Sequence, residues 1–325
     1  MTDRKPRVLA TRHFPADVEA RLAANFDAKL NVEDKLYDGA ALAKASEGFD
    51  GIMCAAGDPL NADTIAKLPA SVRMIATFSV GYEHVDVAAA AKRKILVSNT
   101  PDVLTDATAD IAMLCMLGAA RRAHEGTTML RTHSWVGWEP RQLMGVHVTG
   151  KRLGILGMGR IGQAMADRAR AFRMTIHYSN RTRLEPDLEK GAIFHANPDD
   201  MLAHCDFLSI NAPMTPATRK WVNAERIAKL PKGAIVVNTA RGGVVDDEAL
   251  IAALNSGHLA SAGIDVFDGE PKIHAGYYGL QNAFLLPHMG SATVETRNAM
   301  GFKALDNLEA FLLRKQAPPD LVKAS

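Results

Sequence analysis

The sequence predicts an α/β protein built from two doubly wound parallel-sheet domains. Short apolar runs that suit buried strands alternate with helical stretches, which is typical of a parallel sheet covered by helices on both faces. The alternation occurs twice, once before and once after a long apolar stretch at residues 105–122. The length of 325 residues is enough for two domains that each have a core.

The first series of elements lies before residue 100. Its expected strands and helices are the strands 7–11, 51–55, 74–78 and 95–98 and the helices 17–26 and 62–67. The run at 105–122, TDATADIAMLCMLGAARR, begins with residues that can cap a helix and is apolar nearly all round. We therefore expect a helix there that packs between domains or subunits.

The second series begins at residue 151. Its expected elements are the strands 151–156, 174–179, 206–213, 233–240 and 261–267 and the helices 161–172, 223–230 and 246–256. A last helix is expected at 293–313, where apolar residues repeat along one helical face. That pattern predicts a helix docked onto a core.

The composition argues against several classes of protein. A net charge of +2 and short, separated basic clusters give no reason to expect a nucleic-acid partner. No apolar run approaches the ~20 residues of a membrane span, and the N-terminus lacks the apolar segment of a signal peptide. We therefore expect a cytoplasmic protein. No spacing of cysteine, histidine or acidic residues matches a metal motif, so no metal site is expected.

A glycine-rich loop follows the strand at 151–156 and opens the helix at 161–172. Gly157, Gly159 and Gly162 have the spacing G-x-G-x-x-G. The first glycine permits a tight turn, the second lets a pyrophosphate approach the backbone, and the third lets helix and strand pack closely. The helix N-terminus supplies unpaired N–H groups for phosphates. This context favours a dinucleotide site over an ordinary turn.

The end of the next strand indicates which dinucleotide would bind. An NAD-preferring site carries an acid about 20 residues after the first glycine, but residues 177–184 read HYSNRTRL and contain no carboxylate. The residues there that could contact the cofactor are Ser179, Asn180, Arg181 and Thr182. Arg181 and Arg183 offer positive charge for a 2′-phosphate, which a carboxylate would repel. We therefore expect NADP, with an exposed basic loop as the alternative.

Three polar residues, Arg241, Glu270 and His288, each follow an expected strand. Arg241 and Glu270 follow the strands 233–240 and 261–267, and His288 follows a further expected strand that ends near Leu285. Open α/β sheets bind ligands at the carboxyl ends of their strands. Arg241 can hold a substrate carboxylate as a bidentate fork and polarise the neighbouring carbonyl. His288 can donate a proton when hydride reaches the carbonyl carbon. Glu270, bonded to the other ring nitrogen, would stabilise the protonated ring and fix its orientation. The three residues therefore suit reduction of a 2-oxo acid.

Six segments of the chain carry a family resemblance. They are SVGYEHVD (79–86), LGILGMGRIG (153–162), NAPMTPATR (211–219), VVNTARGGVVDDEAL (236–250), AGIDVFDGEP (262–271) and LPHMGSATVETR (286–297). On these segments the chain resembles the D-2-hydroxyacid dehydrogenase family, and within it the glyoxylate/hydroxypyruvate reductase branch. The resemblance implies two Rossmann/flavodoxin-like domains, with a cofactor domain at 101–287 inserted into a substrate-binding domain at 1–100 and 288–325.

The resemblance also implies roles for individual residues. It implies that Arg241, Glu270 and His288 are catalytic, and that backbone amides around Val80 and Gly81 bind the substrate carboxylate. The further cofactor contacts that it implies are Arg160, Ile161, Pro213, Thr218, Thr239, Ala240 and Asp265.

An irregular stretch at 133–150 carries a tryptophan, Trp138, in the sequence GWEP. Similar stretches in the reductase branch reach across a dimer interface into the pocket of the neighbour. The resemblance therefore implies a homodimer in which Trp138 closes the substrate pocket over small substrates. An ordinary interface tryptophan is the alternative.

The sequence thus predicts an NADPH-dependent reductase of small 2-oxo acids, glyoxylate and hydroxypyruvate. One alternative keeps the chemistry and changes the substrate to a larger 2-oxo acid. Another is a dinucleotide-sensing, corepressor-like binding module, because transcriptional corepressors resemble this family and can retain the same three residues. Phosphite dehydrogenases also resemble the chain, but they would need an extra cation near SVGYEH, which shows none.

Overall fold

The structure is a computed structural model that describes residues 4–323. The chain forms two compact units, one containing the chain up to Leu104 and from Ala292 onward, the other containing Thr105–Ser291. The second unit is therefore inserted into the sequence of the first. The chain passes from the first unit to the second after residue 104 and returns after residue 291. Each boundary lies four residues beyond the one expected, at 100 and at 287. His288, expected at the start of the returning segment, belongs to the second unit.

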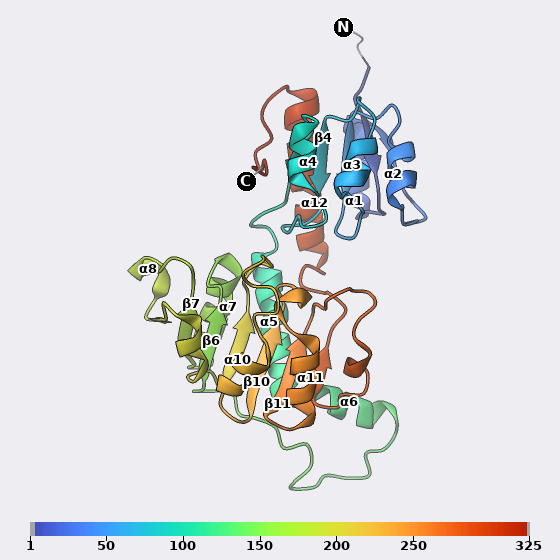
Figure 1. Cartoon of the computed structure of the whole chain (residues 1–325). Coiled ribbons are helices and arrows are strands. Elements are labelled where there is room, and N and C mark those ends of the chain that lie inside the picture. Colours follow the sequence, from blue (N-terminus) through green and yellow to red (C-terminus); the bar gives the residue numbers. More distant parts are fainter. Residues whose placement is uncertain (1–3, 324–325) are drawn as a thin grey trace. The chain divides into compact units, whose positions relative to one another are not determined.

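The first unit is built on a five-stranded parallel sheet with the order β2-β1-β3-β4-β5 (Figure 1). Its strands are β1 (Arg7–Ala10), β2 (Asp27–Lys29), β3 (Gly51–Cys54), β4 (Met74–Thr77) and β5 (Leu96–Ser98). The structure confirms the four expected strands, which are apolar and mostly buried. The edge strand β2 was not expected, because its sequence, DAK, is largely exposed and carries no apolar run.

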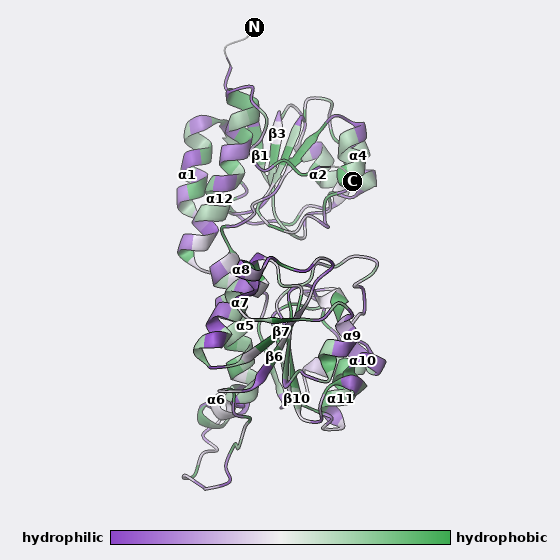
Figure 2. Ribbon diagram, turned by 90° about the vertical axis from the view of Figure 1, so that its left-hand side faces the viewer, coloured by the Kyte–Doolittle hydropathy of each residue, from purple (hydrophilic) through white to green (hydrophobic). Residues whose placement is uncertain are grey.

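Helices cover both faces of this sheet. They are α1 (Ala16–Asn25), α2 (Gly39–Ala45), α3 (Ala62–Lys67), α4 (Val87–Lys92) and α12 (Val294–Leu308), which continues as a π-helical turn (Glu309–Leu313). Apolar residues of α1 and α12 form the core on one face, and those of α2, α3 and α4 form it on the other (Figure 2). Side chains that accept backbone N–H bonds fix the helix starts at Asp38, Asn61, Asp86 and Thr293.

The second unit is built on a seven-stranded sheet in which all pairs are parallel. Its order is β12-β11-β10-β9-β6-β7-β8. The strands are β6 (Arg152–Leu156), β7 (Thr175–Ser179), β8 (Ile193–Phe194), β9 (Phe207–Ile210), β10 (Ala234–Asn238), β11 (Leu259–Ile264) and β12 (Ala283–Leu285). The strand order reverses between β6 and β9, which is where such sheets bind ligands. The two parallel sheets confirm the predicted fold class.

Seven α-helices belong to the second unit. They are α5 (Thr105–Ala120), α6 (Ala123–Arg131), α7 (Arg160–Ala171), α8 (Pro186–Glu189), α9 (Pro198–Leu202), α10 (Ala224–Lys229) and α11 (Asp247–Asn255). Helices α5 and α7 share one core with the sheet, and α9, α10 and α11 share the other (Figure 2). Helix α5 buries most of its apolar surface within this unit, because it packs against α7, β10 and β11. Gly263 allows this close approach, since a Cβ there would overlap the Cys115 carbonyl.

The three cysteines are packing residues. All are buried, and burial raises the pKa of each thiol. Across residues 4–323, no group of three or more histidine, cysteine or acidic side chains is arranged to hold a metal ion. None of the helices described is both long and apolar enough to cross a bilayer.

Candidate active site

A histidine and a glutamate form a close pair beyond the ends of β11 and β12. His288 Nδ1 lies 2.5 Å from Glu270 Oε1, and both side chains are exposed, at 45% and 36%. Glu270 Oε2 also accepts the N–H of Phe267 at 3.2 Å. Burial by itself would raise the pKa of Glu270, but the hydrogen bond and charge of His288 outweigh it and hold that pKa below its usual range. Because Nδ1 is bonded to the carboxylate, Nε2 is the nitrogen that can meet a substrate.

The backbone holds His288 in an uncommon conformation. Its φ is +54°, in the left-handed region that a residue other than glycine seldom adopts. Its N–H donates to the Asp265 carbonyl at 2.9 Å. The Asp265 carboxylate, 1% exposed, accepts the N–H groups of Met289 at 2.6 Å and Gly290 at 2.8 Å. The Asp265 carboxylate thereby fixes the turn that carries His288, and its expected place on the nicotinamide side of the site stays a prediction.

Arg241 follows β10 and lies next to the segment that carries Glu270. Its side chain donates to the Ala240 carbonyl at 2.7 Å, and its own carbonyl accepts from Asn238 Nδ2 at 3.0 Å. Gly242 lets the two segments meet, because a Cβ there would overlap the Phe267 backbone. The charge of Arg241 also contributes to lowering the pKa of Glu270. The structure thus brings all three residues to the carboxyl ends of neighbouring strands.

The glycine loop has the geometry of a phosphate cradle. Gly157 has a φ of +91°, and a Cβ there would overlap the backbone of Ala212. Gly162 packs against the carbonyl of Gly157, whereas Gly159 faces open space. Gly159 is the N-cap of α7 and provides no side-chain cap, and the positive end of the helix dipole there favours an anion. The roles expected for the three glycines therefore match their surroundings.

Several buried polar atoms beyond the strand ends also suit a bound cofactor. Thr239 Oγ1 and Asn211 Oδ1 are buried without a hydrogen-bond partner in the part of the chain described. Thr239 was expected in the cofactor site, next to Ala240, whereas Asn211 was not. Thr218 Oγ1 donates to the Pro213 carbonyl at 2.7 Å and closes a turn after β9. These residues and the glycine loop together fit a dinucleotide.

The basic loop after β7 contains one paired and one unpaired arginine. Arg183 forms two bonds to Glu189, at 2.8 and 3.0 Å, and Tyr178 donates to the same carboxylate at 2.5 Å. The bonds from Arg183 and then Tyr178 lower the pKa of Glu189 to about 2. The Arg181 side chain, by contrast, has no hydrogen-bond or ion-pair partner among residues 4–323. The loop therefore contains a carboxylate, that of Glu189, which the sequence analysis did not predict.

The other expected contacts of this loop differ in their exposure. Asn180 Oδ1 accepts the N–H of Met158 at 2.6 Å, so its side chain ties the end of β7 to the glycine loop. Ser179 is buried, and Thr182 is exposed. Arg160 and Ile161 begin α7, directly after Gly159. Of the expected donors, Arg181 is thus the one whose charge is exposed and unpaired.

Three expected site residues lie elsewhere. Val80 and Gly81 follow β4 in the first unit. Trp138 is 78% exposed and lies in the long loop between α6 and β6, which extends away from the sheet (Figure 1). This loop begins at the end of the unit where the strands start, opposite to His288. The structure therefore does not bring Trp138 to the other expected residues of its own unit.

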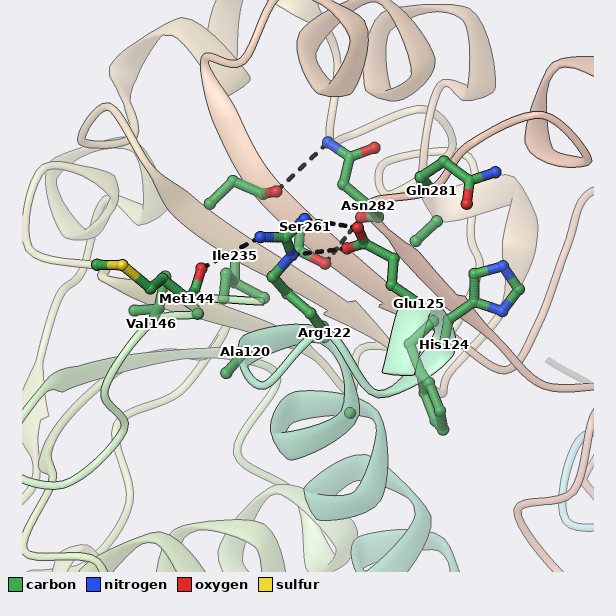
Figure 3. Close-up of a pocket in the computed structure, with 16 residues that line it drawn as sticks. Ala120, Arg122, His124, Glu125, Met144, Val146, Ile235, Ser261, Gln281 and Asn282 are labelled. Atoms are coloured by element: carbon green, nitrogen blue, oxygen red, sulfur yellow. Dashed lines mark hydrogen bonds and ion pairs between the residues drawn. The ribbon is translucent and has the colours of Figure 1, made fainter. Parts of the chain in front are cut away.

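A cavity of about 360 Å³ lies at that opposite end. Arg122, Glu125, Met144, Ser261 and Asn282 are among its lining residues (Figure 3). In the wall of this cavity, the Arg122 guanidinium donates two hydrogen bonds to the Glu125 carboxylate, at 2.7 and 2.5 Å. The cavity is separate from the candidate active site, because it adjoins the starts of β10, β11 and β12 rather than their ends.

Comparison with known proteins agrees with this geometry. Residues 113–290 match the model of the D-isomer specific 2-hydroxyacid dehydrogenase, NAD binding domain. The chain is 42% identical to glycerate dehydrogenase of Hyphomicrobium methylovorum over 308 residues, which is 94% of this chain and 96% of that protein. It is 39% identical to glyoxylate reductase of Thermococcus kodakarensis over 324 residues, or 98% and 96% of the two chains.

A solved structure is also similar. It is the NADPH-dependent glyoxylate/hydroxypyruvate reductase of Sinorhizobium meliloti in complex with NADP and malonate. The TM-score is 0.85 at 34% identity, covering 99% of this chain and 100% of that one. The family model, the relatives aligned over almost their whole length and the glycine loop all indicate the same family. The chain belongs to the D-isomer specific 2-hydroxyacid dehydrogenase family and has the nicotinamide-dinucleotide-binding domain of that family.

Proposed function

We propose that the protein reduces small 2-oxo acids, glyoxylate and hydroxypyruvate, to 2-hydroxy acids with NADPH. The observation that supports this most is the pair of His288 and Glu270 beside Arg241, at the edge of the sheet that also carries the glycine loop. The names of the relatives, glyoxylate reductase and glycerate dehydrogenase, support the substrate class.

Each of the three residues has a distinct task in this reaction. Arg241 binds the substrate carboxylate with two parallel N–H groups and draws electron density from the adjacent carbonyl. The dinucleotide, when bound, supplies the hydride. His288 gives the proton on Nε2 to the carbonyl oxygen as that oxygen gains negative charge. Glu270 holds Nδ1 at 2.5 Å, so the ring keeps its orientation with Nε2 directed away from the carboxylate.

The proposed preference for NADPH rests on Arg181. Because Glu189 neutralises Arg183, Arg181 is the cation of this loop whose charge is available for a 2′-phosphate. We expect Arg181→Asp to raise the KM for NADPH by roughly 10- to 100-fold, since a charge-assisted bond of about 1.5–3 kcal/mol is lost. The KM for NADH should stay the same or fall. Initial rates at varied cofactor concentration measure both constants.

The neighbouring arginine provides a matched control. Arg183→Asp makes the same change of charge in the same loop but breaks the bonds to Glu189, so it should lower the melting temperature more than it changes cofactor preference. If the two variants shift the NADPH-to-NADH ratio equally, the charge of the loop as a whole sets that ratio, and Arg181 does not have the specific role proposed.

We also propose that the protein is a homodimer joined through the stretch after α6. Several apolar side chains in this stretch and in the last turn of α6 are exposed, namely Leu130, Trp135, Val136, Trp138 and Met144. Such a cluster on one segment is a usual mark of an interface. Sedimentation should show a dimer for the wild type and a monomer for Val136→Asp. Val32→Asp, a matched change at an exposed valine of the first unit, should leave the dimer intact; a monomeric wild type would contradict the proposal.

A further inference from the structure

The loop after β4 presents two backbone N–H groups that have no acceptor in the part of the chain that the structure describes. The N–H groups of Val80 and Gly81 donate to no atom among residues 4–323, although both residues are partly buried. A backbone N–H group without a protein acceptor is available to a ligand or to water. Two such groups in succession can together bind an anion. The proposed function assigns that anion, the carboxylate of the 2-oxo acid.

The carbonyl groups of the same peptide units are held from the other side. The Ser79 carbonyl accepts the N–H of Thr100 at 2.9 Å, and the Val80 carbonyl accepts Asn99 Nδ2 at 2.8 Å. A trans peptide unit is planar, and its C=O and N–H point in opposite directions. Each of these bonds therefore sets the direction of an N–H group, that of Val80 in the first case and that of Gly81 in the second.

A chain of side-chain hydrogen bonds supports the next peptide unit. Ser79 Oγ donates to the Gly81 carbonyl at 2.6 Å and lies 2.7 Å from Thr77 Oγ1. Thr77 Oγ1 lies in turn 3.0 Å from His84 Nε2. The carbonyls of residues 79, 80 and 81 each accept a hydrogen bond. Among residues 4–323, Asn99 is the one side chain that bonds to the peptide unit between Val80 and Gly81.

We propose that Asn99 is a positioning residue for the substrate carboxylate, which acts by holding the Val80 carbonyl so that the Gly81 N–H points at the substrate. This inference rests on the proposed function for the identity of the anion. Asn99 also polarises the peptide unit, because a hydrogen bond to its C=O strengthens its N–H as a donor. Its contribution should appear in substrate affinity rather than in cofactor affinity or in stability.

The test compares Asn99→Leu with the wild type in two assays. The KM for glyoxylate should rise roughly five- to tenfold, the effect of one hydrogen bond, while the Kd for NADPH and the melting temperature stay close to wild type. Calorimetric titration with oxalate, a dicarboxylate that accepts no hydride, should show the same factor. Asn31→Leu is the matched control, because Asn31 Nδ2 also donates to backbone carbonyls, at 2.7 and 2.8 Å; it should lower the melting temperature and leave the KM unchanged.

A second variant separates positioning from general damage. In Asn99→Asp the side chain keeps its size but donates a hydrogen bond only when protonated. The ratio of its KM to that of the wild type should therefore fall as the pH is lowered from about 7.5 to 5, across the range in which a carboxylate begins to protonate. A lasting structural defect would give a ratio independent of pH.

The outcomes distinguish the inference from the proposed function. A wild type that binds oxalate but reduces no 2-oxo acid overturns the proposed function and leaves the inference standing if Asn99→Leu weakens the binding. A folded Asn99→Leu whose KM and oxalate Kd lie within twofold of the wild type overturns the inference alone. A wild type that binds no oxalate also overturns it.

Discussion

Replacing His288 with alanine is expected to lower kcat for 2-oxo acid reduction by roughly 10²- to 10⁴-fold, the usual contribution of a positioned general acid. The carbonyl oxygen gains charge as hydride arrives, and without the imidazole it must take its proton from water. The Kd for NADPH should change little, because the glycine loop and the basic loop are on other strands. Steady-state rates and fluorescence titration measure the two effects.

The second unit offers a control for this change. His274 Nε2 lies 2.9 Å from Glu248 Oε1, so it is another partly exposed histidine paired with a glutamate. His274→Ala should leave kcat at the wild-type value. A His288→Ala variant with normal turnover would rule out His288 as the proton donor.

Replacing Arg241 with leucine is expected to lower kcat/KM for 2-oxo acids by at least roughly 100-fold. Two charge-assisted hydrogen bonds to the substrate carboxylate are lost, each of about 1.5–3 kcal/mol. Arg241→Lys should recover part of the loss, because lysine keeps the charge but not the planar fork. Initial rates at low glyoxylate concentration give kcat/KM directly.

A structural arginine of the same unit is the comparison. Arg152 binds Asp206 at the start of β6, with Nη2 to Oδ1 at 2.8 Å. Arg152→Leu should lower the melting temperature and leave kcat/KM near wild type. If Arg241→Leu and Arg152→Leu reduce kcat/KM equally, the effect of the former is on folding and not on substrate binding.

The sequence predicted the fold well wherever burial determines the residue type. Strands with apolar runs, such as β3, β4 and β10, lie where they were expected. The strands that were missed are short and lie at the sheet edges: β2 is polar, and β8 has only two residues. Edge strands bury little, so their sequences carry little of the apolar signal.

The site was predicted as a set of residues, but not as a geometry. Short motifs identified Arg241, Glu270 and His288, because each follows an apolar strand. The role of Asp265 in holding the turn of His288 depends on bonds across 24 and 25 positions of the sequence. Such partners follow from tertiary packing, which local spacing does not encode. Glu189 meets Arg183 across only six positions, because the turn into α8 brings the end of that helix back to the loop.

The most direct test of the proposed function is the initial rate of glyoxylate and hydroxypyruvate reduction, with NADPH and NADH measured side by side. We expect turnover of both acids and a higher kcat/KM with NADPH than with NADH. Tight binding of the cofactor without turnover of any 2-oxo acid would contradict the proposed function and favour a dinucleotide-sensing module. Turnover at equal efficiency with both cofactors would contradict the role assigned to Arg181.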